Sequence, residues 1–156
     1  MLLAPYHPDT HLMTARMLRG LGATGQALIE YQLALRSASD SSVPNLLGEV
    51  MRAYPETDQV IRALPKERPS LFSQLAELAI WTGDPRAESF AALAYKNYPD
   101  EPRAGYVRAR TLVHSGEVDE GRVLALQLLS ESNLSDGIEH RLLHVLWNAG
   151  ERELSA

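Results

Sequence analysis

The fold is decided by residues 70–99, which read SLFSQLAELAIWTGDPRAESFAALAYKNYP. In the first half of this stretch apolar side chains recur at helical spacing until Gly83-Asp84-Pro85 interrupts the pattern as a turn. Asp84 and Pro85 together are a helix-start signal, with Asp as the N-cap and Pro as the first helical residue. Alanines then recur at helical spacing until Tyr98-Pro99 ends the second helix. The stretch therefore predicts two helices joined by a tight turn.

Comparable glycines follow short apolar helical patterns elsewhere in the chain. Gly22, Gly83, Gly116 and Gly150 are separated by 61, 33 and 34 residues. The last two intervals match the roughly 34-residue period of helix–turn–helix repeats. The first interval falls short of two periods, which predicts one degenerate unit over about 39–68. Gly150 is expected to follow the last helix, so that the array breaks off in mid-repeat and the chain is a piece of a longer protein.

Helical periodicity dominates the whole chain, and no convincing alternating strand pattern occurs. We expect about nine helices joined by short connections, over residues 9–21, 26–37, 43–54, 56–64, 70–82, 85–98, 104–115, 118–131 and 135–149. Asp9 is the predicted N-cap of the first helix because its carboxylate can accept from the exposed amides of the first turn.

The chain length is that of a single domain, and the composition predicts a core of small and aliphatic side chains. The 156 residues include only two Phe and two Trp, so that Leu, Ala, Val and Ile must fill the interior. The net charge of −5 argues against nucleic-acid binding, which requires clustered Lys and Arg. Arg outnumbers Lys thirteen to two. Arg favours bidentate contact with carboxylates, although a genomic bias toward Arg codons explains the imbalance equally well.

No catalytic residue, metal or cofactor is predicted, and we expect a protein that is not an enzyme. The chain has no Cys and no G-x-S-x-G pattern, which excludes a Cys nucleophile and that nucleophile elbow. Residues 20–25 spell G-x-G-x-x-G, but no strand precedes them as a dinucleotide site requires. His140 and His144 share a helical face, yet a metal site needs a third ligand and Glu139 points elsewhere.

The chain also lacks sequence signals for membranes and export. Its first residues do not form a signal peptide, and no apolar stretch approaches the ~20 residues that span a bilayer. We therefore expect a soluble chain without direct membrane insertion. Cytosol and periplasm both stay open, because a missing targeting signal proves little for a fragment.

The pattern of small residues and glycines resembles the tetratricopeptide repeat (TPR) family. Its repeats carry a small residue in the first helix, a glycine at the turn, and Ala, an aromatic and Ala in the second helix. The small residue of the first helix and the first Ala of the second face each other where the two helices cross. The first unit supplies Ala15, Gly22, Ala27, Tyr31 and Ala34; the third Phe72, Ala76, Gly83, Ala87, Ala94 and Pro99; the fourth Ala109, Gly116 and Gly121; the last helix Leu143, Leu146 and Gly150. The resemblance implies an all-α, right-handed superhelix of stacked antiparallel helix pairs, with 1–156 as a single repeat domain from which 39–68 departs.

The resemblance also implies a concave groove lined by the first helix of each unit. Its predicted partner-binding residues are Arg16, Arg19, Glu77, Trp81, Tyr106, Arg110, His114, His140, His144 and Trp147, and the same helix positions add Asp9, Leu12, Ser73, Ile80, Arg103, Val113 and Asn148. Aromatic and Arg side chains dominate interface energetics when they are desolvated. We therefore expect a peptide or helix with acidic and apolar residues as the partner. The alternative is that Trp81 and Trp147 pack between adjacent units and that the arginines are solvated.

The predicted function is a non-catalytic protein–protein interaction scaffold, with bacterial envelope or polysaccharide assembly as an analogy from the fold alone. One alternative is a helical domain that regulates or localises a larger enzyme. Another is an RNA-binding helical repeat, against which the net charge weighs. Self-association is also expected, because the last helix offers Leu142, Leu143, Leu146 and Trp147 without an obvious following cap.

Overall fold

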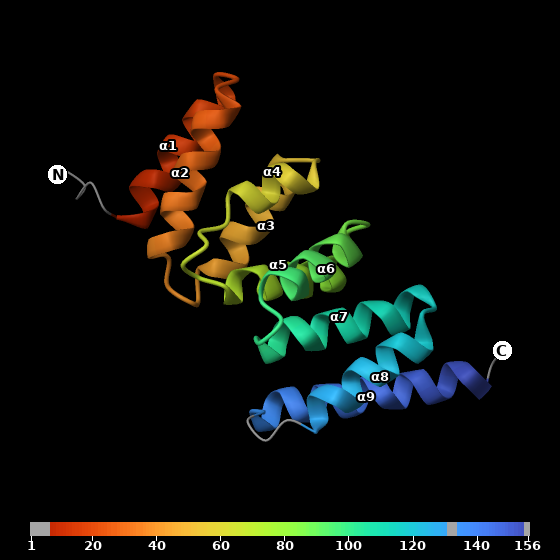
Figure 1. Cartoon of the computed structure of the whole chain (residues 1–156). Coiled ribbons are helices and arrows are strands. Elements are labelled where there is room, and N and C mark those ends of the chain that lie inside the picture. The colour runs from red at the N-terminus through yellow and green to blue at the C-terminus, as the bar shows by residue number, and fades with distance from the viewer. Residues whose placement is uncertain (1–6, 131–133, 155–156) are drawn as a thin grey trace. The chain divides into compact units, whose positions relative to one another are not determined.

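The computed structural model describes residues 7–130 and 134–154, and within them the chain is all-helical (Figure 1). The helices are α1 (Pro8–Gly20), α2 (Thr24–Ser37), α3 (Val43–Ala53), α4 (Thr57–Arg62), α5 (Ser70–Thr82), α6 (Ala87–Asn97), α7 (Pro102–Ser115), α8 (Val118–Leu129) and α9 (Asp136–Leu154). The predicted all-α class and the nine helices are confirmed over the described residues. The predicted end of the eighth helix, Glu131, lies outside them. None of the described helices is long and apolar enough to cross a membrane.

The helices group into two compact units that divide between Leu71 and Phe72. The first unit holds α1 to α4, and the second holds α6 to α9 with all but the first two residues of α5. Each unit is described by itself below. The prediction that residues 1–156 form one repeat domain stays a prediction.

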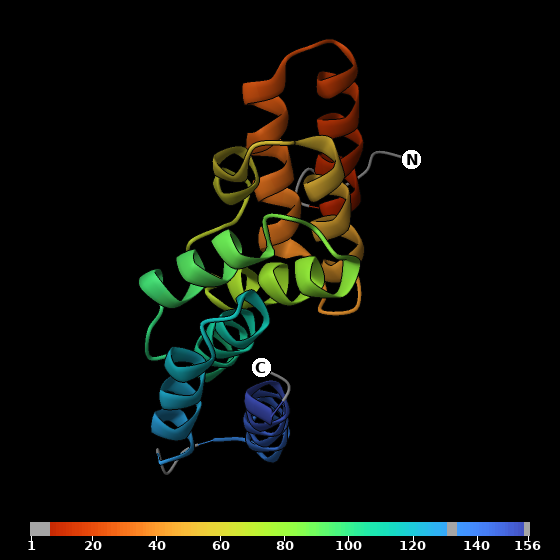
Figure 2. The ribbon, with the colours of Figure 1, turned by 90° about the vertical axis from the view of Figure 1, so that its right-hand side faces the viewer.

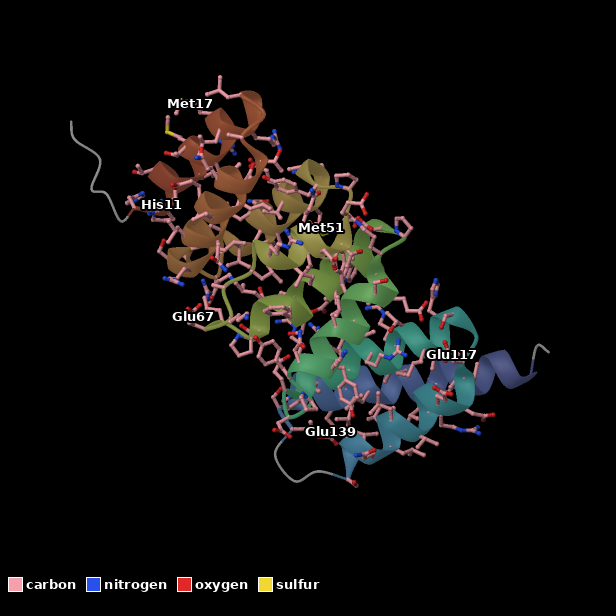
Figure 3. The ribbon with its side chains drawn as sticks, turned by 45° about the horizontal axis from the view of Figure 1, so that its top comes forward. His11, Met17, Met51, Glu67, Glu117 and Glu139 are labelled. Atoms are coloured by element: carbon pink, nitrogen blue, oxygen red, sulfur yellow. The ribbon has the colours of Figure 1, made fainter. Side chains whose placement is uncertain are left out.

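In the first unit α1 and α2 run side by side as an antiparallel pair (Figures 1 and 2). Ala15 of α1 and Ala27 of α2 are both fully buried, so the two backbones approach closely. His11, labelled in Figure 3, hydrogen-bonds to Glu30 of α2 at 2.7 Å. Tyr31 packs edge-on against Tyr54 with ring centres 6.0 Å apart, which ties α2 to the end of α3.

In the second unit α7 and α8 cross closely because two glycines lie at the contact. A Cβ built on Gly121 would stand 2.9 Å from the carbonyl oxygen of Ala109, and one on Gly105 would stand 2.7 Å from Leu128 Cδ1. Both distances are shorter than ordinary van der Waals contact. The expectation that small residues face each other where paired helices cross is therefore confirmed for α7 and α8. Helix α9 then packs on both of them.

Three of the four spaced glycines form the same turn. Gly22, Gly83 and Gly116 have φ of 77°, 68° and 99°, in the left-handed region that favours glycine. In each case the next residue donates its backbone N–H, at 2.9 Å, to the carbonyl five residues before it; Glu117, labelled in Figure 3, is the third of these residues. This is a Schellman-type helix end, and α1, α5 and α7 all end in it.

The fourth glycine does not end a helix, and the predicted end of the last helix at residue 149 is wrong. Helix α9 runs through Gly150 to Leu154. The residues that follow, Glu-Arg-Glu-Leu, are good helix formers, and nothing in their pattern stops the helix.

Several predicted helix starts also need correction. Helix α2 begins at Thr24 and α7 at Pro102, each two residues before its predicted start. Helix α1 begins at Pro8, and its N-cap is His7, whose Nδ1 accepts from the backbone N–H of Asp9 at 3.4 Å. Pro8 displaces the cap from Asp9 because a proline suits the first helical position. Helix α6 begins at Ala87, two residues after the predicted Pro85. The Asp84 carboxylate still accepts from the backbone N–H of Arg86 at 2.9 Å, but in the turn that precedes the helix.

Candidate functional site

A hollow of about 810 Å³ lies in the second unit, where the end of α5 and the start of α6 meet the second half of α7. This volume falls in the range of ~300–1,000 Å³ that is typical of binding clefts. Its lining residues are Ala79, Ile80, Gly83, Asp84, Pro85, Ala87, Glu88, Arg110, Thr111, Val113, His114, Ser115 and Asn148.

Five predicted concave-face residues come together in this hollow. They are Ile80 from α5, Arg110, Val113 and His114 from α7, and Asn148 from α9. Arg110 and His114 are four residues apart and therefore share one side of α7. Ile80, Pro85 and Ala87 supply accessible apolar surface, and Arg110 supplies a positive charge.

Arg110 is held by a tyrosine beneath it. Its Nη1 donates to the hydroxyl oxygen of Tyr106 at 3.0 Å. Tyr106 is only 5% exposed, and the guanidinium of Arg141 lies 5.7 Å from its ring centre. The predicted groove residue Tyr106 therefore cannot offer its ring to a partner. It instead positions two arginines by a hydrogen bond and a cation–π contact.

The acidic side chains of the hollow are both next to arginines. Arg86 binds Asp84 through Nε and Nη2 at 2.9 and 2.7 Å, and these hydrogen bonds hold the pKa of Asp84 below its ordinary value. Glu88 is half-exposed and lies 3.8 Å from Arg108 Nη1. Among the described residues no carboxylate pairs with Arg110. Its guanidinium has five N–H donors, of which the contact with Tyr106 uses one.

Glu77, another predicted groove residue, is the centre of an internal ion-pair cluster. Its side chain on α5 is 11% exposed and accepts from Arg103 of α7, with Nε at 2.8 Å from Oε2, and from Arg141 of α9. A second hollow of about 450 Å³ beside Arg103 and Arg141 also touches Glu101. Burial raises the pKa of the Glu101 carboxyl. Glu77 thus joins α5, α7 and α9 and is not available to a partner.

The two predicted groove residues of the first unit differ from each other. Arg16 makes a bidentate pair with Glu49 of α3, through Nε at 2.9 Å and Nη2 at 2.7 Å. Tyr31 donates its hydroxyl to the same carboxylate at 2.9 Å. Burial, followed by this hydrogen bond, raises the pKa of Tyr31 to about 12. Arg19 is exposed on α1.

The remaining predicted residues lie on exposed helix faces. Trp81 and Trp147 are 76% and 67% exposed, so neither belongs to the core of the second unit. Together with His140 they do not line the hollow. His144 is exposed, and its Nδ1 accepts from the side-chain amide of Asn148, which does line the hollow, at 3.2 Å. In the part of the chain that the structure describes, no three His, Cys, Asp or Glu side chains gather as metal ligands.

The sequence-based prediction missed the side of the hollow that is formed by the α5–α6 turn and the start of α6. Asp84, Pro85, Ala87 and Glu88 line the hollow, whereas the prediction took residues only from first helices. The helix-start signal at Asp84-Pro85 could have identified this side of the hollow, because it places the start of α6 directly beside the end of α5.

Comparisons of the chain with protein-family models, with curated proteins and with solved structures give no match. The resemblance to TPR repeats therefore rests on the residues quoted above and on their geometry.

Proposed function

We propose that the chain is a non-catalytic interaction scaffold of TPR-like helix pairs, which binds a segment of a partner protein in the 810 Å³ hollow of the second unit. The observation that carries the proposal is the convergence of Ile80, Arg110 and Asn148 from three helices on that hollow. A site assembled from three packed helices is preformed, so that binding does not have to order the receptor.

The repeated geometry supports the TPR-like part of the proposal. The glycine turns after α1, α5 and α7 share the same backbone hydrogen bond. The close crossing of α7 and α8 at Gly121 is the contact that the TPR pattern of small residues requires. A right-handed superhelix of such pairs is the arrangement that we propose for the whole chain.

The lining of the hollow favours a partner segment that carries an acidic side chain next to an apolar one. Arg110 offers N–H donors in a planar fork that fits a carboxylate, and no described carboxylate uses them. The accessible apolar lining of the hollow comes from Ile80, Pro85 and Ala87. An apolar side chain placed there loses water while the neighbouring carboxylate pairs with Arg110.

The proposal can be tested with a phage-displayed library of random short peptides, selected on the full chain. We expect the selected peptides to share Asp or Glu next to Leu, Ile, Val or Phe. The Arg110→Glu variant should weaken their binding at least about tenfold, because a like charge then faces the peptide carboxylate.

The matched control is Arg122→Glu on α8. Arg122 pairs with Asp119 on the same helix and does not line the hollow, so this variant makes the same charge change elsewhere in the unit. We expect it to bind the peptides as the unmodified chain does. Equal weakening by both variants, or selected peptides without acidic residues, would show that the hollow is not the binding site.

A further inference from the structure

Helix α9 carries apolar residues on two faces, and only one of them is covered. Leu142, Val145 and Ala149 are buried against the rest of the second unit. On another face stand His140, Leu143, His144 and Trp147, all exposed, at the i, i+3, i+4 and i+7 spacing of one helix side. Figure 2 looks nearly along α9 and shows α7 and α8 on one side of it, with no described helix of the second unit on the other.

The chain itself shows what normally covers this face. Ala15, Ala76 and Ala109 each lie seven residues before a spaced glycine, and each is fully buried. For Ala109, the antiparallel helix that follows supplies the cover through Gly121. Leu143 lies seven residues before Gly150 and is 51% exposed. The open face of α9 is therefore the place where an antiparallel helix packs in the earlier pairs.

We propose that the α9 of a second copy of the chain takes this place, antiparallel and related by a two-fold axis level with Val145. In this register Leu143 faces the second copy's Trp147, and Trp147 faces the second copy's Leu143. His140 faces the second copy's Gly150, which has no side chain and nothing within 4 Å of its Cβ position. A two-fold interface requires a surface that complements itself, and this face meets the requirement.

The charge of this face also permits a second copy to bind. His140, Leu143, His144 and Trp147 carry no formal charge when the histidines are neutral. Two chains of net charge −5 can therefore meet along this face without placing like charges opposite each other at its centre. The central Leu–Trp contacts bury two large apolar side chains of α9 that are 51% and 67% exposed.

The first experiment measures the molar mass of the full chain against concentration by light scattering and sedimentation equilibrium. We expect a monomer–dimer equilibrium. Leu143→Glu or Trp147→Glu should raise the dimer Kd at least about tenfold by bringing a charge into the apolar contact. A chain that stays monomeric at millimolar concentration would overturn the proposal.

Matched controls are Val123→Glu and Leu126→Glu on α8, which place the same charge on other exposed apolar residues of the second unit. Both should keep the Kd of the unmodified chain. Far-UV circular dichroism checks that each variant is folded. If the α8 variants dissociate the dimer as strongly as the α9 variants, the interface lies elsewhere and the proposal fails.

The second experiment tests the register. Because the chain has no cysteine, each introduced Cys is the only thiol that a cross-linker can react with. The Leu143→Cys and Trp147→Cys variants are treated with a short bismaleimide cross-linker, each alone and mixed. Antiparallel pairing predicts a several-fold higher yield of cross-linked dimer in the mixture. A higher yield from either variant alone would overturn the proposed register. The Arg110→Glu variant should dimerise normally, which separates this interface from the proposed partner site.

Discussion

Gly121 of α8 lies directly against the backbone of Ala109 in α7. A Cβ built on Gly121 would stand 2.9 Å from the Ala109 carbonyl oxygen and 2.6 Å from Val113 Cγ2. Backbone cannot move aside as the end of a flexible side chain can, so only glycine allows this crossing. The distance between α7 and α8 is thus set by the absence of one methyl group.

The Gly121→Ala variant should therefore lose about 1–3 kcal/mol of unfolding free energy through overpacking, even though Ala has the higher helix propensity. Urea denaturation followed by circular dichroism measures the change. Gly25→Ala in α2 is the control, because nothing lies within 4 Å of the added methyl group. That variant should be neutral or more stable by up to about 1 kcal/mol. Equal behaviour of the two variants would contradict the close crossing.

A second prediction concerns Gly116 and Gly150, which fit the same repeat spacing but have different roles in the structure: Gly116 forms a turn, whereas Gly150 lies inside a helix. Gly116 has φ of 99° and should cost about 1–2 kcal/mol when replaced by Ala, since a Cβ is strained in the left-handed region. Gly150 is helical with open space around its Cβ position, and Gly150→Ala should add up to about 1 kcal/mol. Thermal unfolding of the two variants should show shifts of opposite sign. Destabilisation by both would mean that α9 ends at Gly150 after all.

The sequence predicts the local structure of this chain well, because helices and glycine turns are encoded by neighbouring residues. The resemblance to TPR repeats implies that Ala109 and Gly121 face each other, and the structure shows this contact. Errors arise where two local signals compete. Asp9 is a good cap by itself, but Pro8 takes the first helical position and moves the cap to His7.

The candidate site could be predicted only in part, because position on a helix does not reveal a side chain's partners. Arg110, His114 and Ile80, which were predicted to share one face, line the same hollow. Glu77 was predicted to face a partner, yet it pairs with Arg141, which lies 64 residues away in the sequence. Such a contact depends on how three helices pack. A repeat pattern from one sequence carries no signal for it.

The Arg16–Glu49 pair predicts how the stability of the first unit depends on pH. The hydrogen bond from Arg16 holds the pKa of Glu49 below its ordinary value of 4.5. Folding therefore favours the ionised form, and this stabilisation is complete above the unfolded-state pKa and disappears as the pH falls through the folded-state pKa. Glu49→Gln should lower the unfolding free energy by about 1 kcal/mol at pH 7, since Arg16 is half-exposed, and by much less near pH 3.

The control for that experiment is Glu67→Gln, which removes an exposed partner of Arg36. Exposed pairs contribute little, so this variant should stay within about 0.5 kcal/mol of the unmodified chain at both pH values. Chemical denaturation at the two pH values provides the comparison. A Glu49→Gln effect of the same size at pH 3 would show that the ionised carboxylate is not its source.

The Glu77 cluster should be the main polar link between α5, α7 and α9. Glu77→Gln removes the charge that Arg103 and Arg141 share and should cost about 1–3 kcal/mol of unfolding free energy. Arg103→Ala should cost much less in the Glu77→Gln background than in the unmodified chain, because its partner is already gone. Salt at 1 M should reduce the effect only in part, since Glu77 is buried. Additive losses in this double-mutant cycle, measured by urea denaturation, would show that the contact contributes no coupling energy.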